Sequence, residues 1–569
     1  MVQRILLALI LSFIVTACLA QPDSLEVVSP DTLLTQSPQV DRALIEAQIV
    51  RQMNTRDLFR PFLRESSPQL SSLDLYRASY HAVGLDNALT ASERHGFTTL
   101  PGIWSRAYIL QHYDTFYEQS SRGSTLVYGE DDYTQPVMLT DLQAGLGDYE
   151  FNFARLGLKK NQLFGFPGLS YRLDFLAQTG LWTGIDHDQT SMRHYLSARL
   201  GKFLIETEYA NWAVDASSQD LQPLWWKSSN FVIDHKLRQL YAALRNPWLD
   251  LSLLSTAERA KAGTVGLDQK NSSLQLKASK TLKVGKHSLS AEYEHLQTDL
   301  DYSPRNTSVS RIYDDLLKAV YGFSNADLNL QLEAELYDFE HLRLEGDSAW
   351  NWLGMTLGMR GMVSGLDPEP VSLIDIYNPA LVITPVNQYL NAMASGYLSA
   401  HLSPALSIGL NAGLKQYHSP GTGPAWEDRT QLPFADMKAG LETSFGSYRL
   451  SAGQSVNWQG QAEPVPGGFE IAELPQWRYQ THIQLQRDMR NDNRLFGGLS
   501  YLGHSSYFSA TQSGQEFYAA GIMDLWAGVQ ISKLFELKLS FKNVLDTDIY
   551  GVYPVPRSVH ATLRWFYLN

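Results

Sequence analysis

The sequence feature that most constrains the fold is an alternation of apolar and polar residues, which recurs from about residue 146 to the end of the chain. In the segment 328–336, Leu and Ala occupy every second position, and Asn, Gln and Glu stand between them. The same alternation runs through the segments 169–178, 406–415, 477–486 and 535–542. A period of two predicts β-strands that present one apolar face and one polar face. The chain is therefore expected to be all-β over most of its length.

A soluble sandwich also alternates, but three features favour a barrel that spans a membrane. The alternating segments are often about ten residues or longer, which is the length that crosses a bilayer at a tilt, whereas strands of soluble proteins average about five or six. The polar faces carry rows of Glu, Lys, Arg, Gln and Asn, which suit a water-filled interior. Aromatic residues stand near the ends of several expected strands, as they do at membrane interfaces. These are Trp458, Trp477, Trp565 and Tyr567.

The composition agrees with an outer surface that meets lipid. Asp, Glu, Lys and Arg make up 18 % of the chain, against about 25 % in ordinary soluble proteins. The formal net charge is −13, and an acidic chain does not suit nucleic acid, which binds to a basic face. The single cysteine, Cys18, excludes a disulfide framework and a cysteine-rich metal site.

Residues 1–20 have the features of a secretory signal peptide. Arg4 supplies the positive start, an apolar stretch runs from Ile5 to Val15, and small residues precede Gln21. The apolar stretch is too short to span a membrane as a helix. An alternative interpretation of Val15–Cys18 is a lipoprotein signal, in which Cys18 would be lipidated, although an integral barrel needs no lipid anchor. Together with the alternation, the signal predicts that the chain resides in the bacterial (Gram-negative) outer membrane.

The length of the alternating region sets the size of the barrel. Residues 146–569 hold about 21 strands, at roughly 20 residues for each strand and its share of loop. Because bacterial single-chain barrels usually have an even number of strands, we expect a transmembrane antiparallel β-barrel of about 20–22 strands. Residues 21–145 would form a small N-terminal mixed segment. A barrel this wide encloses an aqueous channel unless a plug fills it, so the contents of the lumen decide the mechanism.

The end of the chain resembles the barrel of TonB-dependent receptors. In that family a long strand leads to an Asn-Leu-Phe-Asp-x-x-Tyr-like turn, then to a Pro-Gly-Arg-like turn and a final aromatic-rich strand. The similar pieces here are Asn543–Tyr550, Pro554–Arg557 and the strand Val559–Asn569. Two departures from the family pattern are the last residue, which is not aromatic, and the missing Gly of the second turn.

The resemblance implies an outer-membrane transport protein for a small solute, with a plug domain inside the barrel and a TonB box before the plug. A segment similar to the TonB box follows the signal peptide and consists of Asp23, Ser24, Leu25, Glu26, Val27, Val28 and Ser29. An ordinary N-terminal tail is the alternative. The plug itself is not recognisable, since residues 30–145 contain one Arg-Gly, in a Ser-rich stretch, and no Asp-Gly. A shortened plug and a periplasmic extension that leaves the barrel open remain as alternatives.

Four charged residues on polar strand faces are expected to line the lumen, namely Glu333, Glu335, Arg478 and Lys538. The two glutamates stand two positions apart, so they share a face and could select cations, as rings of acidic side chains do. The alternative is plain solvation of the wall. Asp186–Asp188 and Glu130–Asp132 are interpreted as hydrated acidic loops, because three adjacent side chains cannot converge on one ion. No metal or cofactor is therefore expected.

The sequence contains no Gly-x-Ser-x-Gly elbow, no His-Glu-x-x-His and no phosphate loop, so an enzyme is not expected. The main interpretation is a porin-like transport barrel that passes small solutes, with a reduced or absent plug. One alternative is an energised TonB-dependent transporter with a divergent plug. Another is a surface-binding or adhesion barrel whose long loops carry the function. Expected partners are outer-membrane lipid, a small-molecule solute and the outer-membrane assembly machinery, with TonB added for the energised transporter.

Overall fold

The computed structural model describes four short strands in the N-terminal part of the chain and most of the chain beyond residue 136. The N-terminal strands are β1 (Ala91–Ser92), β2 (Phe97–Thr98), β3 (Asp114–Ser120) and β4 (Gly123–Gly129). The other described residues are 137–148, 150, 152–179, 185–218, 231–262, 267–303, 310–364, 373–374, 382–383, 389–418, 429–460, 476–508, 516–517, 519–532, 534–547 and 557–568. The signal segment with Cys18 and the TonB-box-like segment Asp23–Ser29 lie outside the described residues.

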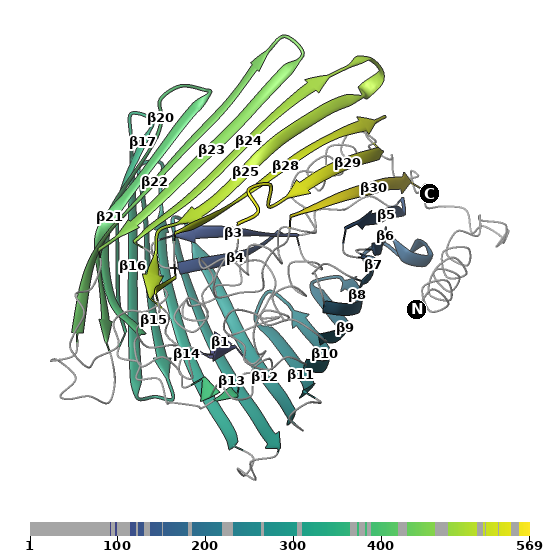
Figure 1. Cartoon of the computed structure of the whole chain (residues 1–569). Helices are drawn as coiled ribbons and strands as arrows, with labels where there is room; N and C mark the ends of the chain where they lie inside the picture. The colour runs from purple at the N-terminus through teal and green to yellow at the C-terminus, as the bar shows by residue number, and fades with distance from the viewer. Residues whose placement is uncertain are drawn as a thin grey trace, which may run out of the picture.

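Twenty-two strands form one closed antiparallel barrel. Each strand pairs with the next barrel strand along the chain, and the last strand, β30, pairs with the first, β5, where the ring closes (Figure 1). The expectation of about 20–22 strands is confirmed. The barrel strands are β5 (Leu139–Gly147), β6 (Asn152–Asn161), β7 (Leu169–Thr179), β8 (Ile185–Leu200), β9 (Phe203–Ser218), β10 (Phe231–Arg245), β11 (Asp250–Ala262), β12 (Leu267–Val284), β13 (His287–Ser303), β14 (Ser310–Ser324), β15 (Leu328–Tyr337), β16 (His341–Trp352), β17 (Met355–Ser364), β20 (Tyr389–His401), β21 (Leu406–His418), β22 (Arg429–Phe445), β23 (Tyr448–Gln459), β24 (Trp477–Asp488), β25 (Arg494–His504), β28 (Ala520–Ile531), β29 (Phe535–Lys542) and β30 (Ser558–Leu568).

The alternation of the sequence becomes the two faces of this ring. On β15 the apolar residues Leu328 and Leu332 are exposed, whereas the polar residue Glu335 is buried. The same division holds on the other strands, where large exposed hydrophobic side chains mark the outer face and buried charged side chains mark the inner face. The five segments whose alternation predicts strands correspond to β7, β15, β21, β24 and β29.

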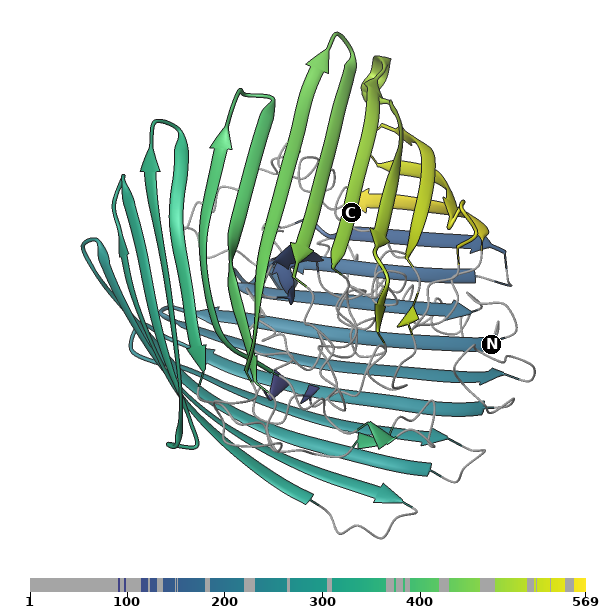
Figure 2. The ribbon, with the colours of Figure 1, turned by 60° about the vertical axis from the view of Figure 1, so that its left-hand side comes forward.

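The two ends of the barrel have different connections. At one end the hairpins close in turns such as 201–202, 285–286 and 446–447, and in each of these a glycine at positive φ provides the left-handed backbone that such turns need. At the other end several connections are much longer, and those that hold the short strand pairs β18–β19 (Leu373–Ile374, Val382–Ile383) and β26–β27 (Tyr507–Phe508, Glu516–Phe517) are among them. Short turns face the periplasm in bacterial outer-membrane barrels, so the long connections face outward. The hairpins follow one another around the ring in Figure 2.

The outer face carries an apolar band of the height that a bilayer requires. On β12 the outward residues Leu274, Leu276, Leu282 and Val284 are exposed, and the one charged outward residue among them, Lys280, donates to the carbonyl oxygen of Pro247. The span from Leu274 to Val284 is about 34 Å along the strand, or about 25 Å along the barrel axis at the usual tilt. Aromatic pairs flank the band: the ring centroids of Trp565 and Tyr567 are 6.0 Å apart near the short turns, and those of Trp458 and Trp477 are 6.2 Å apart at the opposite end. Among the described residues, no helix is long and apolar enough to cross a membrane.

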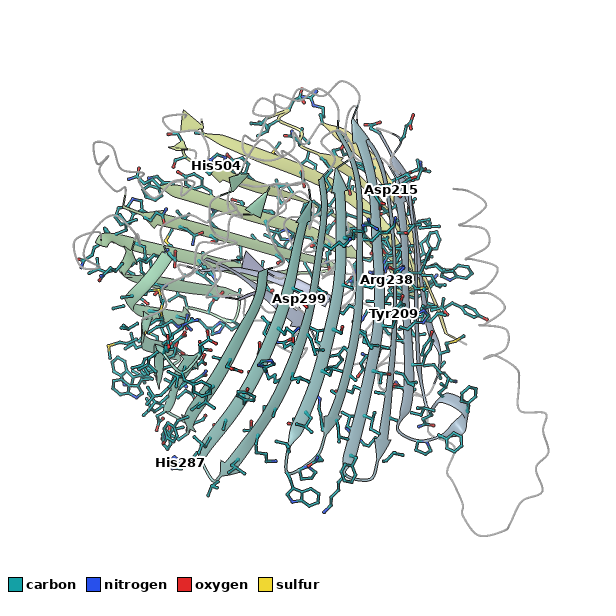
Figure 3. The ribbon with its side chains drawn as sticks, turned by 90° about the horizontal axis from the view of Figure 1, so that it is seen from below. Tyr209, Asp215, Arg238, His287, Asp299 and His504 are labelled. Carbon is teal, nitrogen blue, oxygen red and sulfur yellow. The ribbon has the colours of Figure 1, made fainter. Side chains whose placement is uncertain are left out.

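The barrel begins at Leu139, so residue 146, the expected boundary, falls inside β5. The pattern is weak there because Thr140 and Ala144 face outward and give little contrast with Asp141 and Gln143. Upstream of the barrel, β3 and β4 form an antiparallel hairpin. In all three views this hairpin lies within the outline of the ring (Figures 1 to 3).

Several inner-face glycines lie under an aromatic ring of a neighbouring strand, and we expect them to resist substitution. A Cβ atom at Gly498 would lie 2.3 Å from the carbonyl oxygen of Ile483 and 2.6 Å from Cζ2 of Trp526, whereas one at Gly453 would meet nothing within 4 Å. Gly498→Ala should lower the free energy of unfolding by about 1–3 kcal/mol through overpacking. Gly453→Ala should be neutral or slightly stabilising. Urea unfolding in lipid vesicles measures both, and equal effects would contradict the assignment.

Candidate functional site on the inner wall

The inner face carries a set of buried charged and amide side chains from strands all around the ring, which we name the inner belt. None of its members is more than 9 % exposed. The inner belt consists of Asp141, Arg155, Asp174, Arg193, Glu208, Gln239, Gln275, Glu294, Glu335, Arg343, Lys415, Asp436, Asp524, Lys542 and Arg564. Within the belt, acidic and basic residues alternate from strand to strand in several places, which allows their charges to balance.

One chain of ion pairs crosses four neighbouring strands from β6 to β9. Arg155 Nη2 lies 3.2 Å from Asp174 Oδ1, and the other oxygen of Asp174 lies 3.7 Å from Arg193 Nη1. Arg193 Nη2 then donates to Glu208 Oε2 at 2.8 Å. The register places the four residues on one face. Asp174 pairs directly with Arg193, Arg155 lies two positions from the residue opposite Asp174, and Glu208 lies two positions from the residue opposite Arg193.

A second chain of ion pairs crosses β14, β15 and β16 and contains both predicted glutamates. Lys318 Nζ donates to Glu333 at 2.5 Å and to Glu335 at 3.0 Å. Arg343 Nη1 lies 3.4 Å from the second oxygen of Glu335. The structure therefore brings Glu333 and Glu335 together with two cations, so the pair is not a bare acidic patch that would select cations. It is also not simply hydrated, which was the alternative.

The seam of the barrel is closed by a buried ion pair between the last and the first strand. Arg564 on β30 donates through Nε to Asp141 Oδ1 at 3.0 Å and through Nη2 to Oδ2 at 2.8 Å, which is a bidentate arrangement. The guanidinium also lies 4.4 Å from the ring centroid of Phe566. Gln143 contacts the same carboxylate through its amide nitrogen. This pair joins residues at opposite ends of the barrel sequence.

The inner wall also has an apolar cluster, which interrupts the polar face. Met362 on β17, Met393 on β20 and Phe434 on β22 pack together and are buried. Lys415 on the strand between them holds its ammonium 5.1 Å from the centroid of the Phe434 ring. The sequence signal for this cluster is the presence of methionine and phenylalanine at positions where the alternation calls for polar residues.

The burial of the inner belt constrains what the lumen contains. A ring of 22 strands is wide enough to enclose a channel of water unless it is plugged. Side chains such as Glu208 (4 % exposed) and Gln239 (2 % exposed) face into that ring. Side chains of neighbouring strands contribute to this burial, since Glu208 accepts a hydrogen bond from Arg193 of the adjacent strand.

The other two predicted lumen residues lie elsewhere on the ring. Arg478 is on β24, where its backbone pairs with Asn457 of β23 and His504 of β25. Lys538 is on β29, and its ammonium lies 5.7 Å from the ring centroid of Trp526. The structure does not bring these residues together with Glu333 and Glu335, because β24 lies seven strands and β29 ten strands from β15 in the ring.

The acidic segment Asp186–Asp188 lies in β8 rather than in a loop. Glu130–Asp132 lies outside the described residues. Among the described residues there is no group of three His, Cys, Asp or Glu side chains placed to hold a metal ion.

Comparison with known proteins shows the fold of the barrel. No protein-family model matches the chain, and no curated protein matches it by sequence. Solved structures do match. The FrpB iron transporter of Neisseria meningitidis (F3-3 variant) has a TM-score of 0.61 at 8 % identity, over 79 % of this chain and 85 % of its own. The ferric-catecholate import receptor Fiu of E. coli K12 in its closed form has a TM-score of 0.55 at 10 % identity, over 80 % and 85 %. The siderophore receptor PirA of Pseudomonas aeruginosa has a TM-score of 0.56 at 11 % identity, over 78 % and 83 %.

The fold and the two faces of the ring define a bacterial outer-membrane β-barrel. The resemblance of the last strands to TonB-dependent receptors is confirmed at the level of fold, because the solved structures that match are receptors of that kind and the barrel is closed with 22 strands. At these identities the comparisons show the architecture of the chain and do not identify its solute.

Proposed function

We propose that this chain is a gated outer-membrane transporter for a small solute, in which the N-terminal segment 21–138 occupies the lumen. The burial of the inner belt carries the proposal, since a segment inside the 22-strand ring would cover these charged side chains. The position of the β3–β4 hairpin within the outline of the ring supports it. A filled lumen favours the energised alternative over a permanently open pore.

The solute class is proposed from the structural neighbours. Their names describe an iron transporter, a ferric-catecholate import receptor and a siderophore receptor. An iron chelate would need a wide barrel and long outward connections, and this chain has both. Asp23–Ser29 is the proposed TonB box, and Arg478 and Lys538, together with Glu333 and Glu335, are the proposed lumen residues.

A porin-like pore remains a second candidate because of one observation. Residues 30–145 lack the Asp-Gly dipeptide that the plug of TonB-dependent receptors carries in a recognisable strand context. A segment that is not a plug would leave the pore permanently open.

The conductance of planar bilayers distinguishes these two functions. We expect the chain 21–569 to be silent and a chain that starts at residue 139 to conduct steadily. The truncation must leave Leu139–Gly147 intact, because β5 closes the ring against β30. A variant that lacks only residues 21–29 is the matched control, which should stay silent in bilayers but lose uptake that depends on the proton-motive force. Steady conductance of the chain 21–569 would contradict the gated transporter and favour the open pore.

A further inference from the structure

One patch of the inner wall differs from the inner belt because it contains no Asp, Glu, Lys or Arg. It lies on β23, β24 and β25, which are neighbours in the ring (Figure 1). The residues of β24 in this patch face inward, because they alternate with Ile483 and Leu485, which are exposed on the outer face. We name the patch the polar strip, and it comprises three successive inward positions of each strand: Ser451, Gly453 and Ser455, His482, Gln484 and Gln486, and Phe496, Gly498 and Ser500.

The polar strip is more accessible than the inner belt. All nine of its residues are half-buried, whereas no member of the inner belt is more than 9 % exposed. A Cβ atom at Gly453 would meet nothing within 4 Å, so there is free space beside the middle of the strip. The strip is therefore a part of the inner wall that a solute in the lumen can contact.

The hydrogen-bonding groups of the polar strip are not used within the described part of the chain. The side-chain amides of Gln484 and Gln486 have no hydrogen-bond partner among the described residues, and the buried Oγ of Ser455 has none either. Beside the strip, Ser540 on β29 lies opposite Trp526 and is 1 % exposed, and its Oγ also lacks a partner in the described structure. Buried polar groups are nearly always hydrogen-bonded, and each amide offers two N–H donors and an acceptor oxygen. These groups suit a ligand that brings hydroxyl or amide groups of its own.

Aromatic rings adjoin these hydrogen-bonding groups. The ring of Trp526 on β28 extends along the wall over Gly498, where a Cβ atom would lie 2.6 Å from Cζ2 of the indole. The ring of Phe496 extends in the same way over Gly528, where a Cβ atom would lie 2.4 Å from Cζ of the phenyl ring. His482 stacks on Trp526 with ring centroids 5.2 Å apart. The wall therefore offers an apolar surface next to free hydrogen-bond donors and acceptors, which suits a solute that has both polar and apolar faces.

The charged side chains around the polar strip carry both signs. Lys438 and Glu442 flank the strip on β22, and they stand opposite residues of β23. Arg449 lies 3.3 Å from Asp488 at the end nearer the short turns, and Lys538 lies beyond Trp526 with its ammonium 5.7 Å from the ring centroid. Cations and anions alternate around the strip, so it lacks the single-sign field that concentrates an oppositely charged solute.

We propose that the polar strip is the path along which the transported solute crosses the barrel, and that this solute is uncharged and rich in hydroxyl or amide groups. The inference rests on the proposed function, since a transporter is what brings a solute into the lumen. Gln484 and Gln486 hydrogen-bond to the solute, and Trp526 and Phe496 contact its apolar face. A saccharide and a neutral ferric hydroxamate chelate share this chemistry.

Uptake by cells that express the full-length chain and lack other receptors for the probes tests this proposal. The radiolabelled probes are a neutral ferric trihydroxamate, an uncharged linear oligosaccharide and an anionic ferric tricatecholate. The strip variant is Gln484→Leu with Gln486→Leu. The matched control is Gln416→Leu with Gln431→Leu, because these glutamines stand opposite each other on the outer face of β21 and β22. Heat-dependent gel migration confirms that each variant is folded.

We expect one of the two uncharged probes to enter faster than the tricatecholate, and its identity distinguishes a saccharide from a chelate. Its rate of uptake at low concentration should fall about tenfold in the strip variant, through the loss of two amide groups, and stay unchanged in the control. The proposal is overturned if the strip variant takes up the probe as fast as the wild type or if the control loses as much. Entry of the tricatecholate alone overturns this proposal and leaves the proposed function standing, whereas entry of none of the probes overturns both.

Discussion

Replacement of Arg564 by methionine is expected to lower the free energy of unfolding of the barrel by about 3–5 kcal/mol. The guanidinium of Arg564 is the bidentate partner of Asp141 across the seam, and both side chains are less than 8 % exposed. Without Arg564 the carboxylate stays buried and loses its cation, at the junction where the last strand must find the first. Urea unfolding in lipid vesicles, followed by tryptophan fluorescence, measures the loss.

Two further variants test whether the seam pair itself is responsible. Arg449→Met removes an arginine whose side chain is 59 % exposed and whose partner, Asp488, is 40 % exposed, so it should cost less than about 1 kcal/mol. The double variant Asp141→Asn with Arg564→Met should recover part of the lost stability, because the uncompensated charge is gone. If the double variant is as unstable as the two single changes added together, the pair does not act as a unit.

Replacement of Lys318 by methionine is expected to cost about 2–4 kcal/mol, somewhat less than at the seam because Lys318 retains 21 % side-chain exposure. Its ammonium is shared by Glu333 and Glu335, so its loss leaves the half-buried Glu333 and the buried Glu335 with Arg343 as the remaining cation. The same urea unfolding assay measures the effect.

Glu333→Gln should restore part of the stability that Lys318→Met removes. In the Lys318→Met background it removes one of the two carboxylates and leaves Glu335 with Arg343, so we expect a gain in the free energy of unfolding. In the wild-type background the same substitution should be destabilising. Lys283→Met, an exposed lysine in strand β12 near a short turn, is the control for loss of charge alone. Identical effects of Glu333→Gln in both backgrounds would show that the three residues are not coupled.

The class of fold could be predicted from the sequence because apolar residues at every second position form one apolar face only when the segment is a β-strand. The alternation in 328–336 becomes β15, and the aromatic-rich end of the chain becomes β30. The start of the barrel was harder to place, since β5 has a polar residue, Thr140, on its outward face and two glycines, Gly145 and Gly147, on its inward face. A pattern defined by contrast cannot locate a strand whose two faces differ little.

The ion pairs of the inner wall could not be predicted in the same way. Asp141 and Arg564 are 423 residues apart, and only the closure of the ring makes them neighbours. The sequence shows that Glu333 and Glu335 share a face, but their charge is balanced by Lys318 on β14 and Arg343 on β16, which depends on register. Phe434 and its methionine neighbours stand at polar positions, and nothing local in the sequence reveals that they meet.

The unequal lengths of the strands give the barrel an oblique mouth. β12 and β13 have 18 and 17 residues, whereas β29 and β5, on the other side of the ring, have 8 and 9. The long strands extend beyond the apolar band, and the part that extends carries charged residues on its outer face. The wall is therefore higher at β12 and β13 than beside the seam. The connections on the low side, 505–519 and 543–557, are also much longer than 263–266 and 304–309 on the tall side. If the chain transports a bulky solute, as we propose, the rim that this solute must cross is therefore lower beside the seam than at β12 and β13.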